Sequence, residues 1–126
     1  MSQDVVADGL NMIKNAKKAG KEELEISRYS KLLIKVLEIA KKYGYIKEIF
    51  VDKEGRKLKV KIGNLNDCNA IKPRFYVKVD EVEKYLRRYL PARDFGIIVV
   101  STSKGLITHK EVPEKNLGGS LIAYFY

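Results

Sequence analysis

The sequence predicts an α+β protein built from two small lobes, and three observations support this fold class. The chain has 126 residues, enough for one domain or for two small lobes that share a core. Apolar residues follow the helical period in two segments of the first half and alternate along shorter segments that are typical of strands. Residues 63–74 contain Gly, Asn, Asp and Pro, so we expect a loop there and a boundary between lobes 1–64 and 65–126.

The N-terminal lobe is predicted to have the order α-β-α-β-β. Its expected elements are a helix over 4–20, a strand over 22–27, a helix over 31–43, and strands over 45–51 and 57–62. Asp4 can cap the first helix and Gly20 can end it, while Ser30 is a suitable N-cap for the second. The second helix has a wide apolar face, so we expect it to be largely buried.

The C-terminal lobe is predicted to be mostly antiparallel β with short helices. Its expected elements are a strand over 75–79, a helix over 80–89, a strand over 95–100, a polar loop over 101–105, one helical turn near 108–111 limited by Pro113, a turn through Gly118 and Gly119, and a strand over 121–126. Asp80 and Glu83 form a capping pattern for the helix, and Pro91 stops it. The β-branched run over 95–100 predicts a central strand that is buried on both faces.

Composition excludes several functional classes. No apolar run approaches the ~18 residues of a membrane-spanning helix, and the first 19 residues lack the uncharged apolar core of a signal peptide. A single cysteine and a single histidine predict no disulfide, no metal centre and no other cofactor, and they fit a reducing, cytoplasmic compartment. The net charge of +9 favours polyanionic partners, although it also promotes solubility.

A row of lysines marks the strand over 57–62. Lys57, Lys59 and Lys61 alternate with apolar residues, so they are expected on one face of the strand. Such a row fits a solvated face, an RNA-facing strand, or an edge strand protected by charge. The sequence leaves these interpretations open.

The stretch from Ser101 to Gly105 is the strongest candidate site. Three hydroxyls, the Lys104 ammonium and a glycine follow a buried strand, so their positions should be rigid. This chemistry fits a phosphate cradle or a loop that reads the minor-groove edges and 2′-hydroxyls of RNA. An ordinary polar turn remains the alternative.

No enzyme is expected. Ser101 and Lys104 have the Ser-x-x-Lys spacing of penicillin-recognising enzymes, but that motif opens a helix there and its partner motifs are absent here. We expect His109 to have a surface or capping role and Cys68 to be an incidental thiol in a polar loop.

Two further basic groups are candidates for RNA contact. One comprises Lys72, Pro73 and Arg74; the other comprises Lys84, Arg87, Arg88 and Arg93, interleaved with Tyr85 and Tyr89. Arginine and tyrosine can grip phosphates or stack on bases, but these tyrosines also have the spacing of a helix's apolar face.

Motifs along the whole chain resemble the small-subunit ribosomal protein S8 family. The C-terminal half carries them as FGIIVVSTSKG over 95–105, THKE over 108–111, LGG over 117–119 and AYFY over 123–126. The N-terminal half carries AD-x-L-x-x-I-x-NA over 7–16, SKL over 30–32 and GYI over 44–46. IKPRF over 71–75 and RYLPAR over 88–93 resemble the archaeal and eukaryotic branch, and the chain length suggests the archaeal one. Departures from the family pattern occur at Arg28, at Val112-Pro113 and at Asn116.

The resemblance implies a primary binder of the central domain of small-subunit ribosomal RNA that grips an irregular helix through its minor groove. It implies a place in the cytoplasmic small ribosomal subunit, beside neighbouring ribosomal proteins. Family RNA contacts carried over to matching positions fall on Ser101, Thr102, Ser103, Lys104, Gly118, Gly119, Asn15, Ser30 and Lys31. Gly105, Lys14, Lys72 and Arg74 complete the set of candidate RNA-binding residues. The alternative is a basic architectural protein without a preferred RNA.

Overall fold

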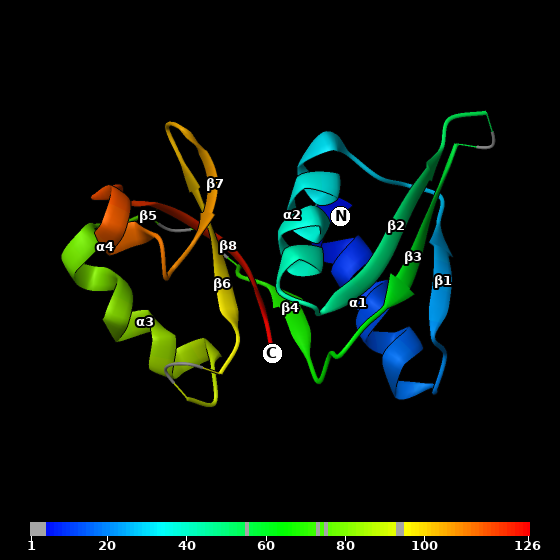
Figure 1. Cartoon of the computed structure of the whole chain (residues 1–126), viewed down its shortest axis with the longest axis horizontal. Helices are drawn as coiled ribbons and strands as arrows, with labels where there is room; N and C mark the ends of the chain where they lie inside the picture. The colour runs from blue at the N-terminus through cyan, green and yellow to red at the C-terminus, as the bar shows by residue number, and fades with distance from the viewer. Residues whose placement is uncertain (1–4, 55, 73, 75, 93–94) are drawn as a thin grey trace. The chain divides into compact units, whose positions relative to one another are not determined.

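Two helices and a three-stranded antiparallel sheet form the first of two structural units in the computed structural model (Figure 1). The structure describes residues 5–54, 56–72, 74, 76–92 and 95–126. The units divide between residues 69 and 70, whereas the sequence placed the boundary between 64 and 65. The residues assigned above to a cap, a strand or a basic group that lie outside the described ones are Asp4, Pro73, Phe75 and Arg93.

The first unit confirms the predicted order α-β-α-β-β. Its elements are α1 (Val5–Lys18), β1 (Glu23–Ile26), α2 (Lys31–Lys42), β2 (Ile46–Asp52) and β3 (Lys57–Ile62). The sheet order is β1-β3-β2. Burial alternates strictly along β3, so one face of the sheet is apolar and is covered by the two helices. The α2 helix begins at the predicted cap, where the Ser30 Oγ accepts a hydrogen bond from the Leu33 N–H at 3.1 Å.

The other face of this sheet carries charges of both signs. Because β3 lies between β1 and β2, the edge-protection interpretation of its lysine row is wrong. We call this surface the outer face; it consists of Glu23, Glu25, Glu48, Phe50, Asp52, Lys57, Lys59 and Lys61. Lys57 pairs with Glu25 at 3.4 Å, and Lys61 pairs with Glu48 at 3.6 Å. With three lysines and four carboxylates, the outer face is charge-compensated in a chain of net charge +9.

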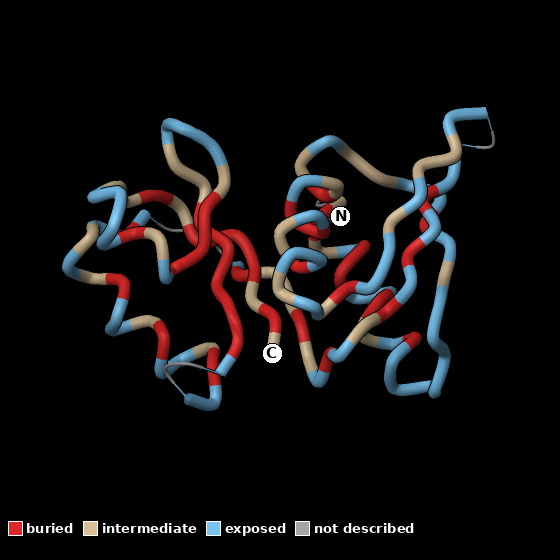
Figure 2. Tube along the Cα trace, viewed as in Figure 1, coloured by how far each residue is buried: buried red, intermediate tan, exposed pale blue. Residues whose placement is uncertain are grey.

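The second unit is built on a mainly antiparallel sheet. Its elements are β5 (Tyr76–Val77), a 3₁₀ turn η1 (Val79–Glu81), α3 (Val82–Tyr89), β6 (Ile97–Thr102), β7 (Gly105–Thr108), α4 (Val112–Lys115) and β8 (Gly119–Phe125), while β4 (Cys68–Ala70) spans the boundary. The strand order is β4-β8-β6-β7, and β5 also pairs with β8. As predicted, β6 is a central strand, and its residues from Ile97 to Val100 are buried (Figure 2).

Two helix starts differ from the sequence prediction. The Glu81 carboxylate accepts a hydrogen bond from the Lys78 N–H at 2.9 Å, so the capping interaction lies two residues before the predicted Asp80–Glu83 pair. The shift occurs because a 3₁₀ turn precedes α3. Pro113 lies in the first turn of α4 instead of limiting a helix. Proline is tolerated there because the first N–H groups of a helix have no intrahelical partner.

The surroundings predicted for Cys68 and His109 are wrong, because both residues are buried. Cys68 is fully buried in β4, and its thiol donates to the Leu10 carbonyl at 3.6 Å, so it does not lie in a polar loop. His109 is 6% exposed and is not on the surface. Its ring Nδ1 accepts a hydrogen bond from the Ile98 backbone N–H at 3.1 Å, and the backbone N–H of His109 donates to the Ile98 carbonyl at 3.0 Å. The imidazole thus takes the place of a backbone carbonyl and extends the β6–β7 ladder.

No helix in the described ranges has the length and apolar character needed to cross a membrane.

Candidate nucleic-acid interface

The Ser101–Gly105 stretch is a tight hairpin instead of a five-residue loop. Ser101 and Thr102 are the last residues of β6, and Gly105 is the first of β7, where it pairs with Thr102. Only Ser103 and Lys104 form the turn, which we call the hairpin turn. Both are exposed, and Figure 2 shows the exposed tip of the hairpin above its buried strands.

The Thr102 side chain braces the hairpin turn. Its hydroxyl donates to the Gly105 carbonyl at 2.7 Å and accepts from the Lys104 N–H at 3.1 Å. Gly105 has a φ of 114°, a conformation that glycine adopts without a steric penalty. The Thr102 hydroxyl is therefore occupied within the protein. The turn presents the Ser103 hydroxyl and the Lys104 ammonium to solvent on a fixed backbone.

Gly118 and Gly119 allow close strand contact instead of forming the predicted turn. Neither has a positive φ, and Gly119 is already the first residue of β8. A Cβ at Gly119 would lie 2.1 Å from the Ser101 carbonyl oxygen, and a Cβ at Gly118 would lie 2.5 Å from the Val77 carbonyl oxygen. The missing side chains let β8 approach β6 on one side and β5 on the other. The glycines thereby hold the base of the hairpin.

The sheet register brings two further residues to the same surface. Tyr76 pairs with Ser120, and Ser120 pairs with Ser101. Directly opposed residues of antiparallel strands lie on the same face, so these three side chains form a row. Sequence reasoning missed Tyr76 and Ser120 because their proximity depends on the pairing of β5 with β8. The only local signal is an aromatic residue two positions after Arg74 in a basic segment.

In the other two groups of the second unit, the basic residues are exposed and the tyrosines between them pack against the core. Lys72 and Arg74 are exposed, as are Lys84, Arg87 and Arg88 of α3. Tyr85 and Tyr89 pack against the core cluster of this unit, and Tyr89 stacks on Tyr124 with ring centroids 5.6 Å apart. The Arg88 guanidinium lies 5.3 Å from the Tyr85 ring centroid. These tyrosines have the structural role that their helical spacing suggested.

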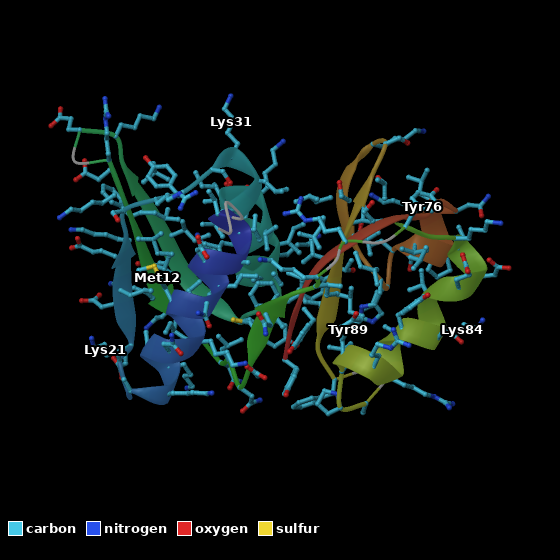
Figure 3. The ribbon with its side chains drawn as sticks, turned by 180° about the vertical axis from the view of Figure 1, so that it is seen from behind. Met12, Lys21, Lys31, Tyr76, Lys84 and Tyr89 are labelled. Carbon is cyan, nitrogen blue, oxygen red and sulfur yellow. The ribbon has the colours of Figure 1, made fainter. Side chains whose placement is uncertain are left out.

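The candidates of the first unit lie on α1 and at the start of α2. Lys14 forms a half-buried ion pair with Asp67 at 3.4 Å, so its ammonium is engaged within the unit. Ser30 is engaged as the α2 cap, as described above. Asn15 is exposed on α1. Lys31 is exposed at the first position of α2 and projects away from the helix (Figure 3).

The chemistry of the described residues fits binding better than catalysis. Burial is the main cause that raises the pKa of the Cys68 thiol to about 12; Asp67 adds to the shift and Lys14 opposes it, so the thiol is neutral at pH 7. Ser101 and Lys104 lie at the end of a strand and in a hairpin turn, where the Ser-x-x-Lys motif of acyl-transfer enzymes would open a helix. Within the described ranges, no three His, Cys, Asp or Glu residues cluster as metal ligands.

Comparison with known proteins assigns the family. The family model described as ribosomal protein S8 matches residues 4–126. A small ribosomal subunit protein uS8 from Archaeoglobus fulgidus is 48% identical over 129 residues, which covers 100% of both chains. The protein of the same name from Nanoarchaeum equitans is 46% identical, and the match covers 100% of both chains. The one from Caldivirga maquilingensis is 42% identical, and the match covers 98% of this chain and 97% of that protein. The chain therefore belongs to the ribosomal protein S8 family and is of archaeal type.

Proposed function

We propose that this protein is a structural constituent of the small ribosomal subunit. In this role it is a primary binder of the central domain of small-subunit ribosomal RNA, and it grips an irregular helix through its minor groove. It works in the cytoplasm beside neighbouring small-subunit ribosomal proteins and supports subunit assembly and translation. The observation that carries the proposal is the braced hairpin turn, which presents small polar groups on a rigid backbone.

The size and chemistry of the hairpin turn suit an RNA minor groove. This groove is wide and shallow and displays 2′-hydroxyls and base edges. Ser103 is small, and its hydroxyl can both donate and accept, so it can contact either kind of group. Because the turn is fixed by Thr102, little conformational entropy is lost when RNA binds.

Lysines supply the second part of the mechanism. Lys31 and Lys104 are exposed and can contact phosphate oxygens. Such contacts set register and strengthen binding, but they carry no sequence information. Selectivity then depends on the hairpin turn and on the shape of an irregular helix with unpaired bases.

The first experiment measures binding to a central-domain fragment of small-subunit ribosomal RNA and to a scrambled duplex of equal length at several salt concentrations. We expect tighter binding to the fragment, with a preference that persists at high salt. Equal affinity for both RNAs, with binding that collapses as salt rises, would identify a basic architectural protein without a preferred RNA.

Three variants then separate the two parts of the mechanism. Ser103→Ala should weaken fragment binding by about fivefold, the effect of roughly 1 kcal/mol for one hydrogen bond, and leave duplex binding unchanged. Lys31→Ala should weaken binding to the fragment and to the duplex, and it should reduce the slope of log K against log salt concentration by roughly 0.7 to 0.9. Lys59→Ala is the matched control, because Lys59 is an exposed lysine on the charge-compensated outer face. If the serine and Lys31 variants lost affinity equally for both RNAs, this division of roles would be wrong.

A further inference from the structure

The row formed by Ser101, Ser120 and Tyr76 extends the surface next to the hairpin turn. We propose that Tyr76 is a stacking platform for an unpaired RNA base, and that Ser120 lies between it and the segment contacted at Ser101. This inference rests on the proposed function and adds a recognition residue to the same surface. It begins from the cross-strand pairing of Tyr76 with Ser120 and of Ser120 with Ser101.

Tyr76 exposes most of its surface to solvent. The ring belongs to a strand of the sheet, yet the residue is 66% exposed (labelled in Figure 3). Its strand neighbour Val77 is fully buried and anchors the backbone of β5. A large aromatic side chain on an anchored backbone, open to solvent, offers a flat surface without needing the strand to move.

Gly118 keeps the edge of this platform clear. A Cβ at Gly118 would lie 3.4 Å from the Tyr76 hydroxyl oxygen, so the phenol lies beside a position that has no side chain. The same residue brings the β5 backbone close to β8, as described above. One glycine therefore both holds the strand of Tyr76 and leaves the phenol accessible.

The chemistry of the row favours a base over a phosphate. Ser101 and Ser120 carry hydroxyl groups, and Tyr76 carries an aromatic ring. Aromatic rings bind nucleic acid mainly by stacking on bases, while hydroxyls suit 2′-OH groups and base edges. An irregular helix supplies unpaired bases beside its minor groove, so a base displaced from the helix could stack on Tyr76.

The chain contains no tryptophan, which makes a direct optical test available. Tyr76→Trp places a single indole on the platform, and Phe50→Trp places one on the outer face, where Phe50 is 62% exposed. We expect the central-domain fragment to quench the fluorescence of Tyr76→Trp and to leave that of Phe50→Trp unchanged. Equal responses from the two variants would overturn the proposal.

Affinities test whether the contact is a stack. Tyr76→Ala should weaken fragment binding by about tenfold, within the range measured for loss of base stacking, and Tyr76→Phe should bind as the natural protein does. The loss should vanish on a fragment whose unpaired bases are replaced so that they form Watson–Crick pairs. If the natural protein does not prefer the fragment, the proposed function itself fails. If it does, and Ser103→Ala weakens binding while Tyr76→Ala does not, only the stacking inference fails.

Discussion

Gly119→Ala tests whether close packing at the base of the hairpin maintains the recognition surface. The new Cβ would lie 2.1 Å from the Ser101 carbonyl oxygen, and real Cβ atoms essentially never approach closer than 3.0 Å. The β8 and β6 backbones must therefore separate by about 0.9 Å. No side-chain rotamer can relieve this contact, because the obstacle is backbone. We expect destabilisation of about 3 kcal/mol, the upper end of the range for overpacked sites.

The assay is thermal unfolding followed by circular dichroism, combined with binding to the central-domain fragment. A loss of about 3 kcal/mol should lower the unfolding midpoint by roughly 10 °C for a chain of this size. The preference for the fragment should also fall, because Ser101 is displaced at the base of the hairpin. Gly20→Ala is the control: no atom lies within 4 Å of the position its Cβ would take, so only the positive φ penalises it, by about 1 kcal/mol, and Gly20 lies outside the recognition surface. A Gly119→Ala protein with unchanged stability and selectivity would refute the packing argument.

Three further predictions concern buried or bracing groups. Replacing His109 with Leu removes the acceptor of the buried Ile98 N–H and should cost about 2 kcal/mol of unfolding free energy, which urea titration measures; His109→Asn, whose carbonyl can accept, should recover part of it. Thr102→Val should weaken binding to the RNA fragment, whereas Thr102→Ser should retain the turn, with affinities measured by filter binding. The pKa of Cys68 is raised in the folded protein, so the stability contributed by its thiol is complete below the ordinary pKa of 9.0 and is lost as the pH rises toward about 12. A thiol reagent at pH 8 should therefore label the native protein far more slowly than the unfolded protein. Equal labelling rates would contradict this prediction.

Local sequence pattern predicted the first unit well because each of its elements carries its own signal. The alternation along β3 and the cap at Ser30 depend on residues close in sequence, and both predictions are confirmed. The buried central strand β6 is confirmed for the same reason, since its β-branched run is unbroken. These features need no knowledge of the partners across the sheet.

Features that depend on strand pairing could not be predicted in this way. From the sequence, Gly119 was interpreted as part of a turn. In the structure its missing side chain allows close contact with the Ser101 backbone in another strand. His109 and Cys68 were misplaced because a lone polar residue gives no local indication of a buried hydrogen-bond partner. The sequence placed the candidate site in the segment 101–105, but the interaction that braces this segment, through Thr102, became visible only with the hairpin geometry.

The charge-compensated outer face also affects how the first unit approaches RNA. Its carboxylates offset the lysines of β3, so the positive excess of this unit lies on its other elements, including Lys17 and Lys31 on the helical layer. The unit therefore has an electric dipole directed from the sheet toward the helices. In the field of a polyanion such a dipole experiences a torque, so RNA of the proposed function should turn the helices toward itself during diffusion. In the proposed function, the carboxylates of the outer face should therefore raise the rate of association with RNA through the field alone.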